Sequence, residues 1–129
     1  MTILLRLLFW AALLFAVVMA LWPLATPIPD VGLGDKWQHM IAFFTLSLLA
    51  ALAYPRTPLR TILLRMAVLG AGIEIAQLLM VSLNRTGSWL DLAADLAATL
   101  VALALAGCVR LLVRRTTRTQ EEPGRSPTA

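Results

Sequence analysis

The chain has 129 residues, of which 60% are hydrophobic and 14% are charged, and its formal net charge is +4. A soluble domain of this size needs more polar surface, so the composition excludes an ordinary soluble protein and favours a membrane protein. No helix-turn-helix or zinc-finger pattern accompanies the positive charge, so no nucleic-acid partner is expected.

Four apolar segments follow one another along the chain and predict an all-α, integral membrane four-helix bundle. Apolar runs of about 18 or more residues are typical of membrane-spanning helices. The transmembrane helices are expected at about 5–24, 36–54, 61–82 and 89–113. A cleaved signal peptide is the alternative for the first segment, but "LWPLATPIP" has no small-x-small cleavage pattern.

The chain is expected to form one bundle with a tail. Residues 1–113 make up the predicted transmembrane domain. Residues 114–129 are polar and contain two prolines and a glycine, so a disordered cytoplasmic tail is predicted there.

The basic residues predict the orientation, because short loops rich in Lys and Arg stay in the cytoplasm. Four helices place the N-terminus, the connection between helices 2 and 3 and the C-terminus on one side. Nine of the eleven basic residues fall on that side: Arg6, Arg56, Arg60, Arg65, Arg110, Arg114, Arg115, Arg118 and Arg125. Both termini are therefore expected in the cytoplasm.

Polar residues interrupt the last three apolar segments at one inferred depth, in the outer half of the bundle. Asp35 and His39 are four residues apart, as are Asp91 and Asp95, so each pair lies on one helix face. Charged groups within a membrane normally face the bundle interior or a water-filled cavity. A polar pocket between helices 2, 3 and 4 is therefore expected, with helix 1 as a lipid-facing buttress. The candidate binding residues are Asp35, Lys36, His39, Glu74, Gln77, Arg85, Asp91 and Asp95.

Several of these residues also have purely structural interpretations. Asp35 and Asp91 suit the first turn of a helix, where the helix dipole favours acids. Lys36 and Arg85 suit the membrane interface as snorkelling charges. Gln77 suits a hydrogen bond between helices.

Three sequence blocks resemble those of the VanZ-like family of small membrane proteins. The blocks are "DKWQHMIAFF", "GIEIAQ" and "NRTGSWLDLAAD", in this order between about Gly34 and Thr99. Asp95 stands where Asn is common in the family, and Ala98 stands where Gly is common. The resemblance implies a bacterial inner (plasma) membrane protein from a family related to glycopeptide resistance, without a settled biochemical activity.

Binding of a cell-envelope or lipid-linked anionic molecule, or of a lipophilic antibiotic, is the first functional hypothesis. The alternative is a membrane-embedded enzyme with His39, Glu74 and Asp95 as acid/base candidates. An ion or proton relay is a third interpretation, which four helices accommodate only if the protein oligomerises. No cofactor and no definite metal site are predicted. A divalent cation (Mg²⁺, Ca²⁺ or Mn²⁺) on His39, Glu74, Asp91 and Asp95 stays open. Membrane lipid and an envelope-derived small molecule are the expected partners.

Overall fold

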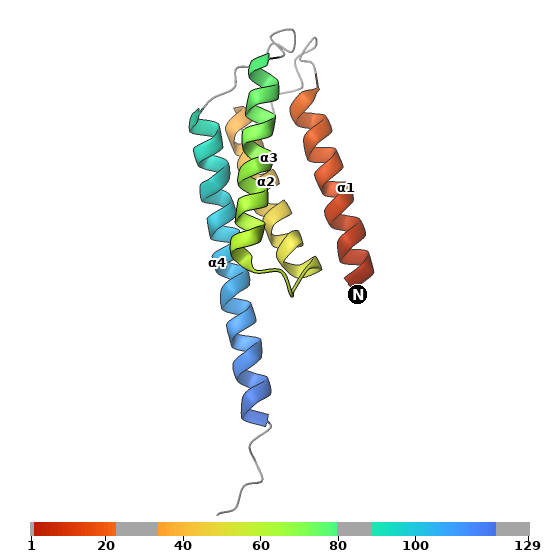
Figure 1. Ribbon diagram of the computed structural model, residues 1–129, viewed down its shortest axis with the longest axis vertical. Coiled ribbons are helices and arrows are strands. Elements are labelled where there is room, and N and C mark those ends of the chain that lie inside the picture. Colours follow the sequence, from red (N-terminus) through yellow and green to blue (C-terminus); the bar gives the residue numbers. More distant parts are fainter. Residues whose placement is uncertain (1, 23–33, 80–88, 121–129) are drawn as a thin grey trace, which may run out of the picture.

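The computed structural model describes residues 2–22, 34–79 and 89–120, and these residues form four helices and no strand (Figure 1). The helices are α1 (Thr2–Leu21), α2 (Gly34–Ala53), α3 (Leu59–Leu79) and α4 (Trp89–Gln120). The predicted all-α, four-helix architecture is therefore confirmed. The segments 23–33, 80–88 and 121–129 lie outside the described residues.

Three of the helices are long and apolar enough to cross a membrane: Ile3–Leu21, Leu59–Leu79 and Trp89–Val113. The apolar part of α2, Trp37–Ala53, is shorter. Large hydrophobic side chains remain exposed on the outer faces of the helices, among them Leu79 and Trp89. Such a surface suits lipid rather than water, and the chain is accordingly a membrane protein.

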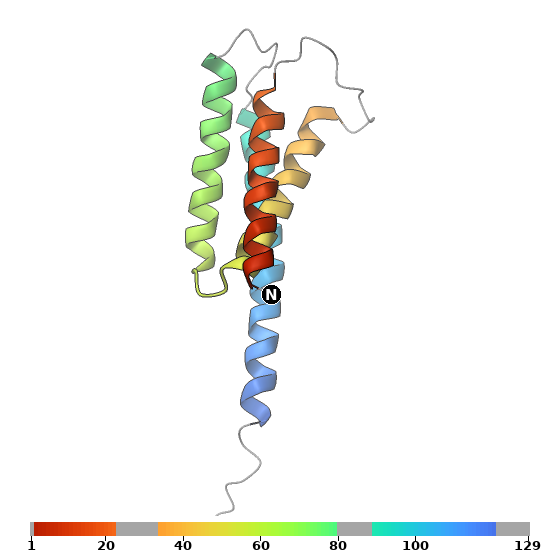
Figure 2. The same cartoon turned by 90° about the vertical axis from the view of Figure 1, so that its right-hand side faces the viewer.

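Successive helices run in opposite directions (Figures 1 and 2). The start of α1, the turn between α2 and α3, and the C-terminal half of α4 therefore share one end of the molecule. This end carries Arg6 of α1, Arg56 of the turn and Arg65 of α3. We call it the basic end, and the opposite end of the bundle the acidic end, because Glu74 and Asp95 lie towards it.

The helix α4 continues well beyond the expected boundary. A disordered tail from residue 114 was predicted, but residues 114–120 are helical. Arginine and glutamine favour a helix, and residues 114–122 contain no glycine or proline. The helix can therefore extend past its apolar part, as Figure 1 shows.

A short turn at the basic end joins α2 to α3. Pro55 follows Tyr54 and cannot continue the helix, and the Thr57 amide donates a hydrogen bond to the Tyr54 carbonyl at 3.0 Å. Arg110 of α4 donates hydrogen bonds to the carbonyls of Ala51 (2.7 Å) and Thr57 (3.1 Å). The guanidinium thus satisfies one carbonyl in the last turn of α2 and one in the turn that follows it.

Helix α1 is attached to the same end through Tyr54. Trp10 donates its indole N–H to the Tyr54 hydroxyl at 3.1 Å, and the Arg6 guanidinium lies 5.2 Å from the Tyr54 ring centre. Phe9 packs edge-on against the same ring. These contacts fix one end of α1 against α2.

Small side chains fill the contact between α2 and α4. Ala50 and Ala51 of α2 are buried, as are Ala98, Ala102 and Ala106 of α4. Small residues allow two helix backbones to approach closely, which is the main source of stability between helices in lipid. The side chains on these two helix faces are therefore held in fixed positions.

Gly70 and Gly72 of α3 differ in the space around them. A Cβ atom at Gly70 would lie 3.0 Å from Leu92 Cδ1 and 3.3 Å from Phe43 Cζ. A Cβ atom at Gly72 would have no neighbour within 4 Å. Gly70 thus lets α3 approach both α2 and α4.

Gly70→Leu should therefore destabilise the bundle, whereas Gly72→Leu should not. Overpacking costs about 1–3 kcal/mol in well-packed proteins. The measurement is the thermal unfolding midpoint of each purified variant in one detergent. Equal midpoints for the two leucine variants would contradict the close approach at Gly70.

Candidate functional site

Three titratable side chains from three different helices meet in the bundle interior. His39 comes from α2, Glu74 from α3 and Asp95 from α4. One potential ligand atom from each lies within 4.8 Å of the other two. The prediction that these three side chains share one space between helices 2, 3 and 4 is confirmed. We call this group the His–Glu–Asp cluster.

The cluster is buried. Asp95 is 1% exposed and Glu74 is 7% exposed. The His39 side chain is 11% exposed, and its Nδ1 lies 3.5 Å from Asp95 Oδ2. A charge-assisted hydrogen bond is usually about 2.7–2.9 Å long, so this ion pair is a loose one.

The second carboxylate oxygen of Asp95 is unusual. Oδ1 is buried and has no hydrogen-bond partner within the part of the chain that the structure describes. A buried carboxylate is normally hydrogen-bonded, paired or bound to a metal. The free oxygen therefore marks the cluster as a place where a further group would fit.

The α2–α4 contact positions two of the three side chains. Ser47 donates its hydroxyl to Thr99 Oγ1 at 3.2 Å, and both residues are completely buried. Thr99 lies one turn beyond Asp95 on the same face of α4. The hydrogen bond thus fixes the register in which Asp95 faces His39.

Gln77 has a different partner from the cluster. Its Nε2 donates a hydrogen bond to the Ala20 carbonyl at 3.0 Å, which joins α3 to the end of α1. The residue is buried, one turn from Glu74 on α3. This contact agrees with its interpretation as a hydrogen bond between helices.

Among the remaining candidate residues, the structure describes the side chain of Asp91. Asp91 is half-buried on α4, one turn before Asp95, and is not a member of the cluster among the described residues. Asp35 and Lys36 lie in the first turn of α2, and their side chains are outside the described part. Arg85 falls in the undescribed segment 80–88.

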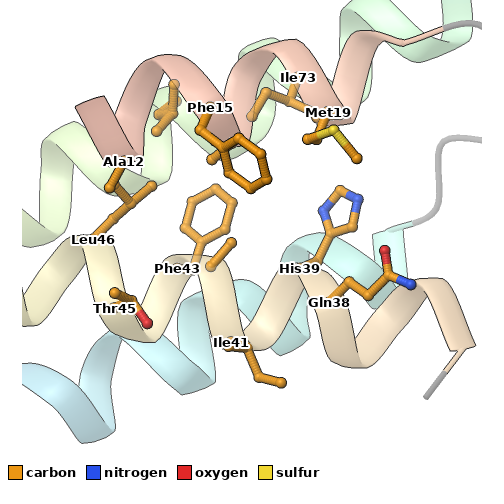
Figure 3. Close-up of a pocket in the computed structure, with 14 residues that line it drawn as sticks. Ala12, Phe15, Met19, Gln38, His39, Ile41, Phe43, Thr45, Leu46 and Ile73 are labelled. Carbon is orange, nitrogen blue, oxygen red and sulfur yellow. The ribbon is translucent and has the colours of Figure 1, made fainter. Parts of the chain in front are cut away.

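A pocket of about 430 Å³ lies beside the cluster, between α1, α2 and α3. Its walls are mostly apolar, and Figure 3 shows Phe15 and Phe43 facing each other across it. The His39 ring points towards Met19 at one end of the pocket. The volume is in the range of small-molecule pockets, about 300–1,000 Å³.

This pocket differs from the one that the sequence predicted. A polar pocket enclosed by helices 2, 3 and 4 was expected, with helix 1 as a buttress. The pocket described here lies between α1, α2 and α3 instead, and α1 contributes Phe15, Met19 and other residues to its wall. The polar groups occupy a compact, buried cluster because charged side chains in a membrane bury themselves against one another.

Two features of the site were missed at the level of sequence. The pairing of His39 with Asp95 was not anticipated. The sequence does contain a signal for it: Asp95, Thr99, Ala102 and Ala106 recur every three or four residues on one face of a helix. The role of α1 in the pocket had no such signal.

Comparisons with protein-family models, with curated proteins and with solved structures found no match.

Removal of the Gln77 hydrogen bond tests how α1 is attached to α3. Gln77→Leu removes the donor to the Ala20 carbonyl and should destabilise the protein by about 0.6 kcal/mol, the average for such bonds in membranes. Gln38→Leu is the matched control, because Gln38 is exposed. The thermal unfolding midpoint in detergent should fall for Gln77→Leu alone. Equal midpoints would show that the bond does not hold α1 in place.

Proposed function

We propose that this protein binds an amphiphilic molecule of the cell envelope, with the apolar part in the α1–α2–α3 pocket and the polar part at His39. The ligand class is a lipid-linked anionic molecule or a lipophilic antibiotic. The observation that carries the proposal is the position of His39, which lines an apolar pocket and is paired with a buried carboxylate at 3.5 Å. Convergence of a few polar groups on an apolar pocket is typical of a ligand site.

The pocket is suited to an apolar chain or ring system. Phe43 and Leu46 of α2 are almost completely buried beneath it, and Ile73 of α3 is buried beside it. Burial of apolar ligand surface against such side chains supplies the affinity, and a polar group at one end fixes the orientation.

The proposal includes the VanZ-like resemblance and a bacterial inner membrane location with both termini in the cytoplasm. The arrangement of the helices supports it: His39 and Glu74, from the first two resembling blocks, lie together in space. The concentration of arginines at the basic end supports the orientation through the positive-inside rule. The cluster then lies in the outer half of the bundle. A role in glycopeptide resistance is no part of this proposal.

A membrane-embedded enzyme is the second candidate, because the His39–Asp95 pair has the arrangement of a base with an orienting carboxylate. Incubation of purified protein with a lipid phosphate distinguishes the two candidates. Release of inorganic phosphate that His39→Gln abolishes would support an enzyme. Binding without any product supports the binding protein.

Filling the pocket should weaken binding. Ala16 lines the pocket on α1, whereas Ala11 on the same helix is exposed and is not part of its lining. The probe is a lipid phosphate with a photoreactive diazirine in its acyl chain, used in nanodiscs. Ala16→Phe should lower cross-linking to the peptides that contain Phe15, Met19 and Phe43 about tenfold, which corresponds to about 1.4 kcal/mol of binding free energy. Ala11→Phe should leave this cross-linking unchanged. Cross-linking spread evenly over the lipid-facing surface would contradict the proposal.

The orientation is tested with cysteine labelling in whole cells. Cys108 is the single cysteine, so Cys108→Ala provides a background without thiols. In that background, Thr86→Cys should react with a membrane-impermeant maleimide and Arg56→Cys should react only after lysis. The reverse pattern would place the basic end outside and the cluster in the inner half.

A further inference from the structure

The arginines that the structure describes near α2 engage its C-terminal end rather than the His–Glu–Asp cluster. Arg6 and Arg110 donate hydrogen bonds to main-chain carbonyls at the C-terminal end of α2, far along the helix from His39. The ion pair that the structure shows at Asp95 is the one with His39. A carboxylate buried within a membrane is costly unless it is paired, hydrogen-bonded or bound to a metal.

The arrangement of donor atoms matches what a metal ion requires. The cluster offers one imidazole nitrogen and two carboxylate oxygens, and these atoms lie within 4.8 Å of one another. Two ligands of a cation at about 2.1–2.6 Å are at most about 4.2–5.2 Å apart. Modest side-chain movement would therefore bring all three atoms onto one ion.

Asp95 provides an independent indication of a missing partner. Its Oδ1 is buried without a hydrogen bond among the described residues, while Oδ2 lies 3.5 Å from His39 Nδ1. A carboxylate with one weakly engaged and one unengaged oxygen in a nearly dry site lacks the partners that a buried charge needs. A cation between the three side chains supplies them.

We propose that His39, Glu74 and Asp95 bind one divalent cation. With a neutral imidazole and two ionised carboxylates, a 2+ ion gives the site a net charge of zero. Mixed nitrogen and oxygen donors suit Mn²⁺ better than a structural zinc, which prefers four sulfur or nitrogen ligands. Three protein ligands leave further coordination positions for water or another oxygen ligand. The cation site stands independently of the amphiphile proposed above.

The site is built on rigid elements, which favours a defined coordination geometry. The Ser47–Thr99 hydrogen bond fixes the register of α2 and α4, and Gly70 allows α3 to approach both. Each ligand comes from a different helix, so the ion would join three helices at the acidic end. Metal binding that holds separate elements together stabilises the folded state.

The test is binding of Mn²⁺ alone to the purified full-length protein, carrying an affinity tag without histidine. The titration follows the electron paramagnetic resonance signal of free Mn²⁺, with no lipid phosphate added. The wild type should bind one ion. Because His39 is the single histidine of the chain, pulsed measurements should show coupling to imidazole nitrogen in the wild type and none in His39→Gln.

Two substitutions that each remove one negative charge separate ligation of the metal ion from general electrostatics. Asp95→Asn removes a ligand and should lower Mn²⁺ affinity by at least about tenfold, since even changes around a metal's ligands cost about 10–100-fold. Asp91→Asn removes the same charge one turn away and should change it far less. Equal losses in the two variants would overturn the proposed ligand set.

Mn²⁺ binding by the wild type tests the proposal even if a variant does not fold. Absence of saturable Mn²⁺ binding, or bound Mn²⁺ without imidazole coupling, would overturn the cation site. Either result leaves the amphiphile proposal standing, because the photoreactive lipid reports on the pocket without added metal. Loss of lipid cross-linking with intact Mn²⁺ binding would contradict the amphiphile proposal and leave the cation site standing.

Discussion

The close approach of α2 and α4 is the constraint on which the rest of the structure depends. Helices in lipid gain little from hydrophobicity, so their association relies on packing of small residues and on hydrogen bonds between helices. Alanines on both helices supply the packing, and the buried Ser47–Thr99 bond supplies the hydrogen bond. Since Asp95 lies one turn from Thr99, the packing that stabilises the bundle also buries Asp95 beside His39. The stability of the fold and the geometry of the site therefore have one origin.

Burial of charge in this position has consequences that a surface ion pair would not have. The Coulomb energy of two charges rises as the dielectric constant falls, and so does the penalty for a charge without a partner. The His39–Asp95 separation is 3.5 Å, and Oδ1 has no hydrogen-bond partner among the described residues, so the pair alone does not satisfy the carboxylate. Ionisable residues kept at such cost inside membranes usually serve a function. This cost is the physical basis of the proposed cation.

The sequence was sufficient to predict the helices and the meeting of His39, Glu74 and Asp95, but not the details of either. Run length and composition identify spanning helices because lipid demands them. Four-residue spacing places two side chains on one helix face, and a similar depth in the membrane brings side chains of different helices to one level. The His39–Asp95 pairing needed the relative rotation of α2 and α4, which small-residue packing decides. Helix α1 is apolar on all sides, so no pattern indicated which of its faces would line a pocket. The membrane-spanning part of α4 was predicted correctly at 89–113. The helical residues 114–120 were not predicted, because apolar length measures the membrane rather than the helix.

The position of His39 couples the pocket to the cluster. The ring lies between an apolar pocket bordered by α1 and a buried carboxylate on α4, and its Nδ1 faces that carboxylate. In an imidazole, the partner of one nitrogen determines the protonation of the other. Any group that engages Asp95, whether a proton or a cation, therefore changes the charge and hydrogen-bonding capacity that the ring presents to a molecule in the pocket. If the proposed cation and the proposed amphiphile are coupled through His39, linkage requires each to alter the affinity for the other by the same factor.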